Sequence, residues 1–132
     1  MLDDQPILLK TRTKPIVGIP YTQECNDVAM MLIQHHKASE YYDRAVDQFE
    51  QLYRDASPRA AVGLQPTDLI RGPGGPSRGS ARIMALVVHP YIMGAPHRLK
   101  YFRAALAHIR AYPDVLFWTG EEILDWYQAQ HA

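Results

Sequence analysis

The chain has 132 residues, 47% hydrophobic and 21% charged, with 14 basic and 14 acidic side chains. This length suits one domain with one hydrophobic core. The balanced charge does not favour binding to nucleic acid or to an anionic membrane surface, and no run approaches the roughly 20 apolar residues of a membrane span. The N-terminus lacks a signal-peptide pattern and Cys25 is the one cysteine, so we expect a soluble, cytoplasmic protein.

Three apolar runs are typical of β-strands. The first, residues 15–21 (PIVGIPY), is rich in β-branched residues and starts with a proline, which a strand tolerates at its first position. Residues 82–89 (RIMALVVH) include six consecutive apolar residues, which predicts a strand covered on both faces, as in a parallel sheet. Residues 115–118 (VLFW) predict a third, shorter strand.

Amphipathic patterns predict a helix after each strand. The first helix covers residues 39–54 with Ser39 as its N-cap, and its apolar stripe is Tyr42, Val46, Phe49 and Tyr53. The second helix has Pro96 in its first turn, and its stripe is Leu99, Phe102, Leu106 and Ile109. The third begins with a capping-box pattern, in which Thr119 is followed three residues later by Glu122.

The order of these elements is β-α-β-α-β-α, and right-handed crossovers in this order give a parallel sheet. We therefore expect an α/β fold with three parallel strands alternating with helices. Residues 57–80 break this pattern, because they hold four of the ten prolines and five of the eight glycines. They predict a flexible insertion loop. The loop would lie at the N-terminal end of the sheet, whereas such folds bind ligands at the opposite end.

His89 is the strongest candidate for chemistry. It ends a wholly apolar run, at the end of a parallel strand where α/β enzymes place reacting groups. Imidazole can give or take a proton near neutral pH, as general acid–base catalysis requires. A histidine that only closes the strand with a hydrogen bond fits the position equally well. Pro90 and Gly94 then shape a loop into the helix at Pro96, whose N-terminal amides could hold an oxyanion.

Other polar residues have ordinary structural explanations. Asp27 could N-cap a further helix over residues 28–36. The adjacent His35 and His36 would point about 100° apart on a helix, so they do not predict a shared metal ion. Cys25 has no metal-ligand spacing around it and is expected to be a packed thiol. No glycine-rich phosphate loop follows any strand, which disfavours a flavodoxin-like binding module.

Three stretches together resemble the polysaccharide deacetylase superfamily (carbohydrate esterase family 4), in the branch of allantoinases and peptidoglycan-deacetylase-like proteins. They are DDQP at 3–6, IPYTQECND at 19–27 and LVVHPYIMGAPHRLKYF at 86–102. The resemblance covers nearly the whole chain outside residues 57–80. It implies a distorted (β/α) barrel that hydrolyses a non-peptide C–N bond in an N-acetylated saccharide or a small cyclic ureide. It also implies that His89 is the general acid toward the leaving group.

The resemblance implies further site residues. The acidic pair at residues 3–4 matches a family loop that orients catalytic groups or substrate, and residues 20–27 match the pocket wall. Arg98 is expected to support the loop that follows His89. The implied substrate-binding residues are Asp3, Asp4, Tyr21, Asn26, Asp27, Tyr91 and Arg98.

The family's aspartate pair, used as base and metal ligand, and its two-histidine metal motif have no counterpart here. Because both belong to the N-terminal half of the family's barrel, we expect this chain to be a C-terminal half of a partial (β/α) barrel. It would hold no cofactor of its own, although full-length relatives can use a divalent metal. Three strands cut from a barrel leave open edges. We expect the chain to be inactive alone and to form a homo-oligomer or pair with a missing N-terminal half. The alternative is a non-catalytic half-barrel that pairs with another chain or with itself.

Overall fold

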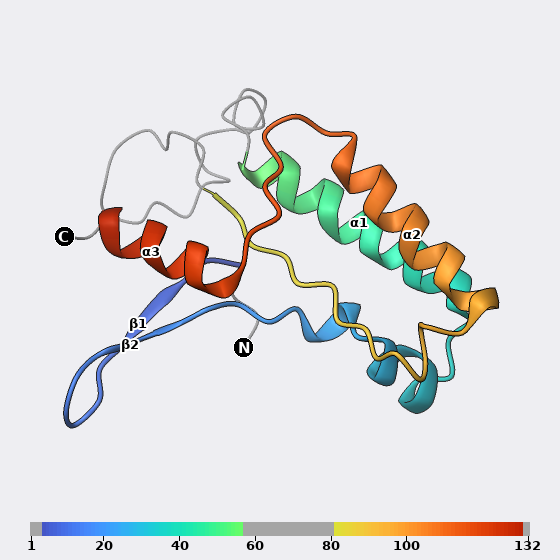
Figure 1. The fold of residues 1–132 in the computed structure, drawn as a ribbon, viewed down its shortest axis with the longest axis horizontal. Helices are drawn as coiled ribbons and strands as arrows, with labels where there is room; N and C mark the ends of the chain where they lie inside the picture. Colours follow the sequence, from blue (N-terminus) through green and yellow to red (C-terminus); the bar gives the residue numbers. More distant parts are fainter. Residues whose placement is uncertain (1–3, 57–80, 131–132) are drawn as a thin grey trace, which may run out of the picture.

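The computed structural model describes residues 4–56 and 81–130 (Figure 1). Its elements are the strands β1 (Ile7–Leu9) and β2 (Ile16–Gly18), the 3-10 helix η1 (Gln23–Cys25), the π-helix η2 (Val28–Ile33), and the α-helices α1 (Ala38–Ala56), α2 (Pro96–Arg110) and α3 (Gly120–Gln130). Within these two ranges, no helix is long and apolar enough to cross a membrane.

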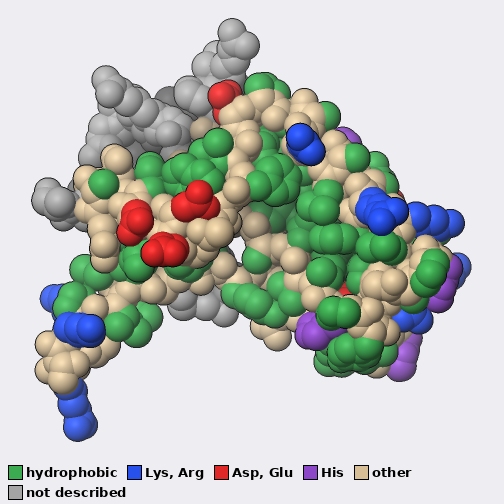
Figure 2. Space-filling view, in the orientation of Figure 1, with side chains coloured by type: hydrophobic (Ala, Val, Ile, Leu, Met, Phe, Trp, Pro, Cys, Tyr) green, Lys and Arg blue, Asp and Glu red, His purple; other side chains and the backbone are tan. Residues whose placement is uncertain are grey.

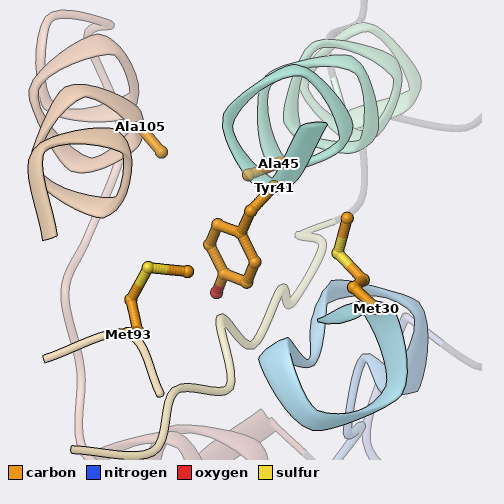
Figure 3. Packing of buried hydrophobic residues seen from close by; sticks show 5 residues of the cluster. All are labelled: Met30, Tyr41, Ala45, Met93 and Ala105. Carbon is orange, nitrogen blue, oxygen red and sulfur yellow. The ribbon is translucent and has the colours of Figure 1, made fainter. Parts of the chain in front are cut away.

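The helices α1 and α2 lie side by side and form one layer, and the extended chain of residues 81–89 runs beneath them (Figure 1). Figure 3 shows the core between these layers. It draws one or two side chains from each of η2, α1, α2 and the loop before α2: Met30, Tyr41, Ala45, Met93 and Ala105. The core thus joins segments that are up to 75 residues apart in sequence.

Helix α1 confirms the predicted helix but not its predicted apolar stripe. The buried residues are Tyr41, Ala45, Phe49 and Leu52. Only Phe49 belongs to the predicted stripe. The helix starts at Ala38, so Ser39 lies inside it and is not its N-cap. The Glu40 carboxylate instead accepts a 2.6 Å bond from the Lys37 amide, which lowers the pKa of Glu40.

Helices α2 and α3 confirm their predicted starts. Pro96 occupies the first turn of α2, where the missing amide is no loss. Before α3, the Thr119 amide donates to the Glu122 carboxylate at 2.6 Å, and the Glu122 amide donates to the Thr119 hydroxyl at 3.3 Å. This reciprocal pair is a capping box. It lowers the pKa of Glu122 because the Thr119 amide bonds the charged form.

The expected fold class, a partial (β/α) barrel with three parallel strands, is wrong. In the part of the chain that the structure describes, one sheet is present, in which β1 and β2 pair antiparallel. The predicted strand 15–21 shortens to β2 and pairs with β1, which was not predicted. A hairpin partner only a few residues away costs less chain entropy to bring together than a distant parallel partner. The Thr11 hydroxyl closes the turn by donating to the Lys14 carbonyl at 2.6 Å.

The other two predicted strands do not form. Residues 82–89 are extended, but they make a single parallel bridge, between Val87 and Asn26. Residues 115–118 have no strand structure. Both runs are apolar enough to be strands, but a strand also needs a neighbour with a matching row of backbone groups. The predicted insertion loop 57–80 lies outside the described residues.

Candidate functional site

Asp27 and His89 form a close pair. Asp27 is fully buried and is the one charged residue so placed within the described ranges. One carboxylate oxygen accepts the His89 backbone amide at 2.7 Å, and the other lies 2.6 Å from the ring atom Nδ1. Because an ionised carboxylate can only accept, Nδ1 carries the proton in this contact. Asp27 therefore fixes both the backbone and the ring of His89.

Backbone bonds bring the two residues together although they are 62 positions apart. The Asp27 amide donates to the Val87 carbonyl at 3.1 Å, and the Val87 amide donates to the Cys25 carbonyl at 2.9 Å. From α1, the Tyr41 hydroxyl reaches both of these carbonyls at 3.4 Å. Burial raises the pKa of Tyr41, so it remains a neutral donor. This role was not predicted, because Tyr41 was not part of the predicted stripe.

Asn26, not Asp27, caps the helical segment that follows. Its side-chain oxygen accepts the amides of Val28 at 2.9 Å and Ala29 at 3.4 Å, whereas Asp27 makes no side-chain cap bond. The Asn26 amide group donates to the Tyr21 hydroxyl at 3.2 Å. The capping interpretation of Asp27 was therefore wrong, and its carboxylate is committed to His89.

The loop after His89 is a tight turn. The His89 carbonyl accepts the amides of Ile92 and Met93, both at 2.9 Å, and the Pro90 carbonyl accepts the Gly94 amide at 3.1 Å. A Cβ atom at Gly94 would overlap the Pro90 carbonyl oxygen, so only glycine fits there. From α2, the Arg98 guanidinium donates to the Ile92 carbonyl at 3.3 Å. Hydrogen bonds therefore hold the backbone both before His89 and after it.

The His89 ring is open to solvent on one side. Its side chain is 37% exposed, and among the described residues no hydrogen bond involves its Nε2 atom. The Tyr91 ring lies edge-on to it, with 5.7 Å between ring centroids, and Tyr91 is 72% exposed. The arrangement is a buried carboxylate, an oriented imidazole and an exposed aromatic ring, in that order outward from the core.

One predicted site residue, Asp4, does not join this group. Asp4 forms an ion pair with Arg82 at 3.3 Å and its carbonyl accepts the Ile83 amide at 2.8 Å. Arg82 is seven residues from His89 along an extended segment, which is about 20 Å. Asp4 therefore lies at the other end of that segment. Asp3 lies outside the described residues.

The remaining candidates show no metal or nucleophile chemistry. In residues 4–56 and 81–130, no group of three histidine, cysteine or acidic side chains could hold a metal ion. His36 instead contacts Glu40 at 3.0 Å. Cys25 is buried, and desolvation raises its pKa to about 11, so it is a thiol and not a thiolate at neutral pH.

An open depression lies elsewhere, along α1 and the turn before it. Its lining is His36, Glu40, Asp43, Arg44, Asp47, Gln48 and Gln51. These side chains are polar and do not include the Asp27–His89 pair.

Comparison with family models, curated proteins and solved structures finds no match to this chain. The site is therefore interpreted from its own geometry.

Proposed function

We propose that this chain contributes the general acid, His89, to a hydrolase that cleaves non-peptide C–N bonds. The observation that carries the proposal is the Asp27–His89 pair, in which a buried carboxylate orients a partly exposed histidine whose Nε2 has no hydrogen-bond partner among the described residues. Cleavage of an amide-type bond requires a proton on the departing nitrogen, and a positioned histidine supplies it near neutral pH.

Asp27 acts as a positioning residue. Its bond to Nδ1 keeps one proton of the His89 ring on that atom, so the proton that His89 would gain or donate is on Nε2. Its bond to the His89 amide fixes the position of the ring. Preset orientation of this kind contributes to rate without any contact with substrate. The complete burial of Asp27 keeps competing water away from the carboxylate.

The proposed substrate is an N-acetylated saccharide or a small cyclic ureide. Both present a flat or ring-shaped body next to the bond that breaks. Tyr91 supports this choice, because its exposed ring stands next to His89 and can pack against such a body. Tyr21 offers a second exposed ring on the chain segment that carries Asn26.

Hydrolysis also needs a group that activates water. The hydrogen bonds around His89 include one carboxylate, Asp27, and both of its oxygens already bond His89. We therefore propose that the base, and any divalent metal, come from a second polypeptide, and that this chain alone has no turnover.

A second candidate is a non-catalytic interaction module. The observation that favours it is the solvent-accessible depression on α1, which lies away from His89. In that case the Asp27–His89 pair only ties the segment around Asp27 to the turn after His89.

The test compares variants after this chain is co-expressed with a separate polypeptide that carries the aspartate and two-histidine motifs of the polysaccharide deacetylases. His89→Gln should lower kcat for acetate release from N-acetylglucosamine oligomers, or for allantoin hydrolysis, by about 10²- to 10⁴-fold. The KM should change little, because the proton is used in the transition state. His97→Gln, at an exposed histidine in the first turn of α2, is the matched control and should leave kcat unchanged.

Nitrogen NMR of the isolated chain gives a readout that needs no partner. His89 should carry its proton on Nδ1 when neutral, and Asp27→Asn should abolish that preference. Equal losses of kcat and of substrate affinity in His89→Gln, absence of turnover in the co-expressed wild type, or a neutral His89 protonated on Nε2 would each contradict the proposal.

A further inference from the structure

The extended segment below the helices uses only one of its two backbone edges. The amides of Ile83, Ala85 and Val87 donate to Asp4, Thr22 and Cys25 respectively, at 2.8 to 3.0 Å. The alternate amides, those of Met84, Leu86 and Val88, have no hydrogen-bond partner among the described residues. Successive amides of an extended chain point to opposite edges. Toward the described residues, the second edge therefore presents a row of amides and carbonyls without hydrogen-bond partners.

This edge belongs to a well-packed element. The side chains of Met84, Leu86 and Val88 pack against the hydrophobic core, which holds the backbone in place. No charged residue interrupts the run from Ile83 to Val88. Natural sheets protect exposed edges with charges, prolines or bulges, and this run has none of them. An uncharged edge of this kind is a template for another strand.

The same chain carries a segment suited to fill such an edge. Residues 115–118 are neither helical nor paired with any described residue. Their side chains are apolar and unusually exposed, with Leu116 at 65%, Phe117 at 61% and Trp118 at 41%. Valine, phenylalanine and tryptophan all favour strands. This segment thus has unpaired backbone groups and apolar side chains that lack a covering surface.

We propose that two copies of this chain exchange these segments, so that residues 115–118 of each copy add as a strand to the Met84–Val88 edge of the other. The exchange is reciprocal, which gives a closed dimer with twofold symmetry. It satisfies the backbone groups of both segments in one ladder and covers the exposed apolar side chains. The proposal does not depend on the proposed hydrolase activity.

We choose a second copy because one chain carries both the unpaired Met84–Val88 edge and the unpaired segment 115–118. In the structure the two segments form no ladder with each other. Exchange between identical chains places each segment against the complementary one without any further partner. A separate protein strand, or pairing within one chain, would give different outcomes in the test below.

The test measures amide exchange by NMR on the full 132-residue chain at low and high protein concentration, alongside its mass by analytical ultracentrifugation. We expect a dimer at high concentration. On dimerisation, exchange at Met84, Leu86 and Val88 should slow by at least about tenfold, while Ile83, Ala85 and Val87 change little. Trp118, in the exchanged segment, is 41% exposed, so tryptophan fluorescence should shift to shorter wavelength.

Two surface variants complete the test. Phe117→Asp should weaken dimerisation by at least about tenfold, because it puts a charge into the exchanged strand. Ile33→Asp is the matched control, since Ile33 is 70% exposed and lies on η2, and it should leave dimerisation unchanged. A monomer at all concentrations, protection that does not depend on concentration, a dimer without the alternating protection, or equal effects of both variants would each overturn the proposal.

Discussion

The helical half of the molecule (η1, η2, α1, α2 and residues 89–95) and the open half (β1, β2, residues 115–119 and α3) bury their apolar side chains very differently. Every member of the buried hydrophobic core lies in the helical half. Helix α3 has no buried residue. The open half instead exposes many of the large apolar side chains, namely Leu8, Leu9, Ile16, Leu116, Phe117, Trp118 and Trp126.

Figure 2 shows apolar side chains at the surface of both halves. Exposed acidic groups lie over α3, and the basic residues of the hairpin turn extend away from the body. The two halves are therefore stabilised by different kinds of interaction. The helical half is held by contacts between distant segments, whereas the open half is held mainly by local bonds, such as the hairpin and the capping box.

The largest expected difference in stability between the halves comes from removing one large side chain from each. Tyr41→Ala should reduce the free energy of unfolding by about 3–5 kcal/mol, because it empties a buried site and removes a hydroxyl that bonds two carbonyls. Trp126→Ala, in α3, should cost less than about 1 kcal/mol. Urea denaturation measures both. Comparable losses would show that α3 packs far more tightly than its exposure indicates.

A second prediction concerns the buried charge. Asp27→Asn should lower the free energy of unfolding by about 1–3 kcal/mol, because one of its bonds to His89 is lost or weakened while the site stays buried. The matched change in the open half, Asp125→Asn at an exposed position, should stay within about 0.5 kcal/mol. If Asp27→Asn is neutral in chemical denaturation, the Asp27–His89 contact does not support the fold.

The smallest predicted effect is local to α3. Thr119→Ala removes the hydroxyl that caps the helix and should cost about 1 kcal/mol, measured as faster amide exchange in the first turn of α3. Glu122 adds a pH dependence. Its folded pKa is lowered, so its contribution is present above its ordinary value of 4.5 and is lost as the pH falls through the folded pKa. As the pH falls, amide exchange should therefore become faster in α3 at a higher pH than in α2, because α2 has no acidic residue in its first turn.

Local signals predicted the helices well. Pro96 at the start of α2 and the Thr119–Glu122 box act over a few residues, so the sequence contains all the information they require. Three of the four residues in the predicted α1 stripe were one position out, and the first of these errors arose because residues 41 and 42 are both tyrosine. Which of the two is buried depends on η2 and the 89–95 turn, which pack against that face.

The sheet could not be predicted in the same way. The run from Ile83 to Val88 has the composition of a buried strand, yet its neighbour in space is the irregular segment around Thr22 and Cys25. Apolar composition does not specify the partner. His89 was the leading candidate by position, and its role in chemistry stays a prediction. Its contact with Asp27 was not predicted, because nothing local links residues 62 positions apart; Asp27 was interpreted as a helix cap and, by resemblance, as a pocket residue.

The turn at Gly94 has a consequence for how mutations at this site should be understood. Any larger residue there must displace the Pro90 carbonyl, and Pro90 is bonded directly to the histidine that Asp27 holds. A single methyl group added at this position would therefore tilt the imidazole while touching neither it nor its carboxylate. Gly94 thus acts on the orientation of His89 through the backbone of the turn, without contacting the ring.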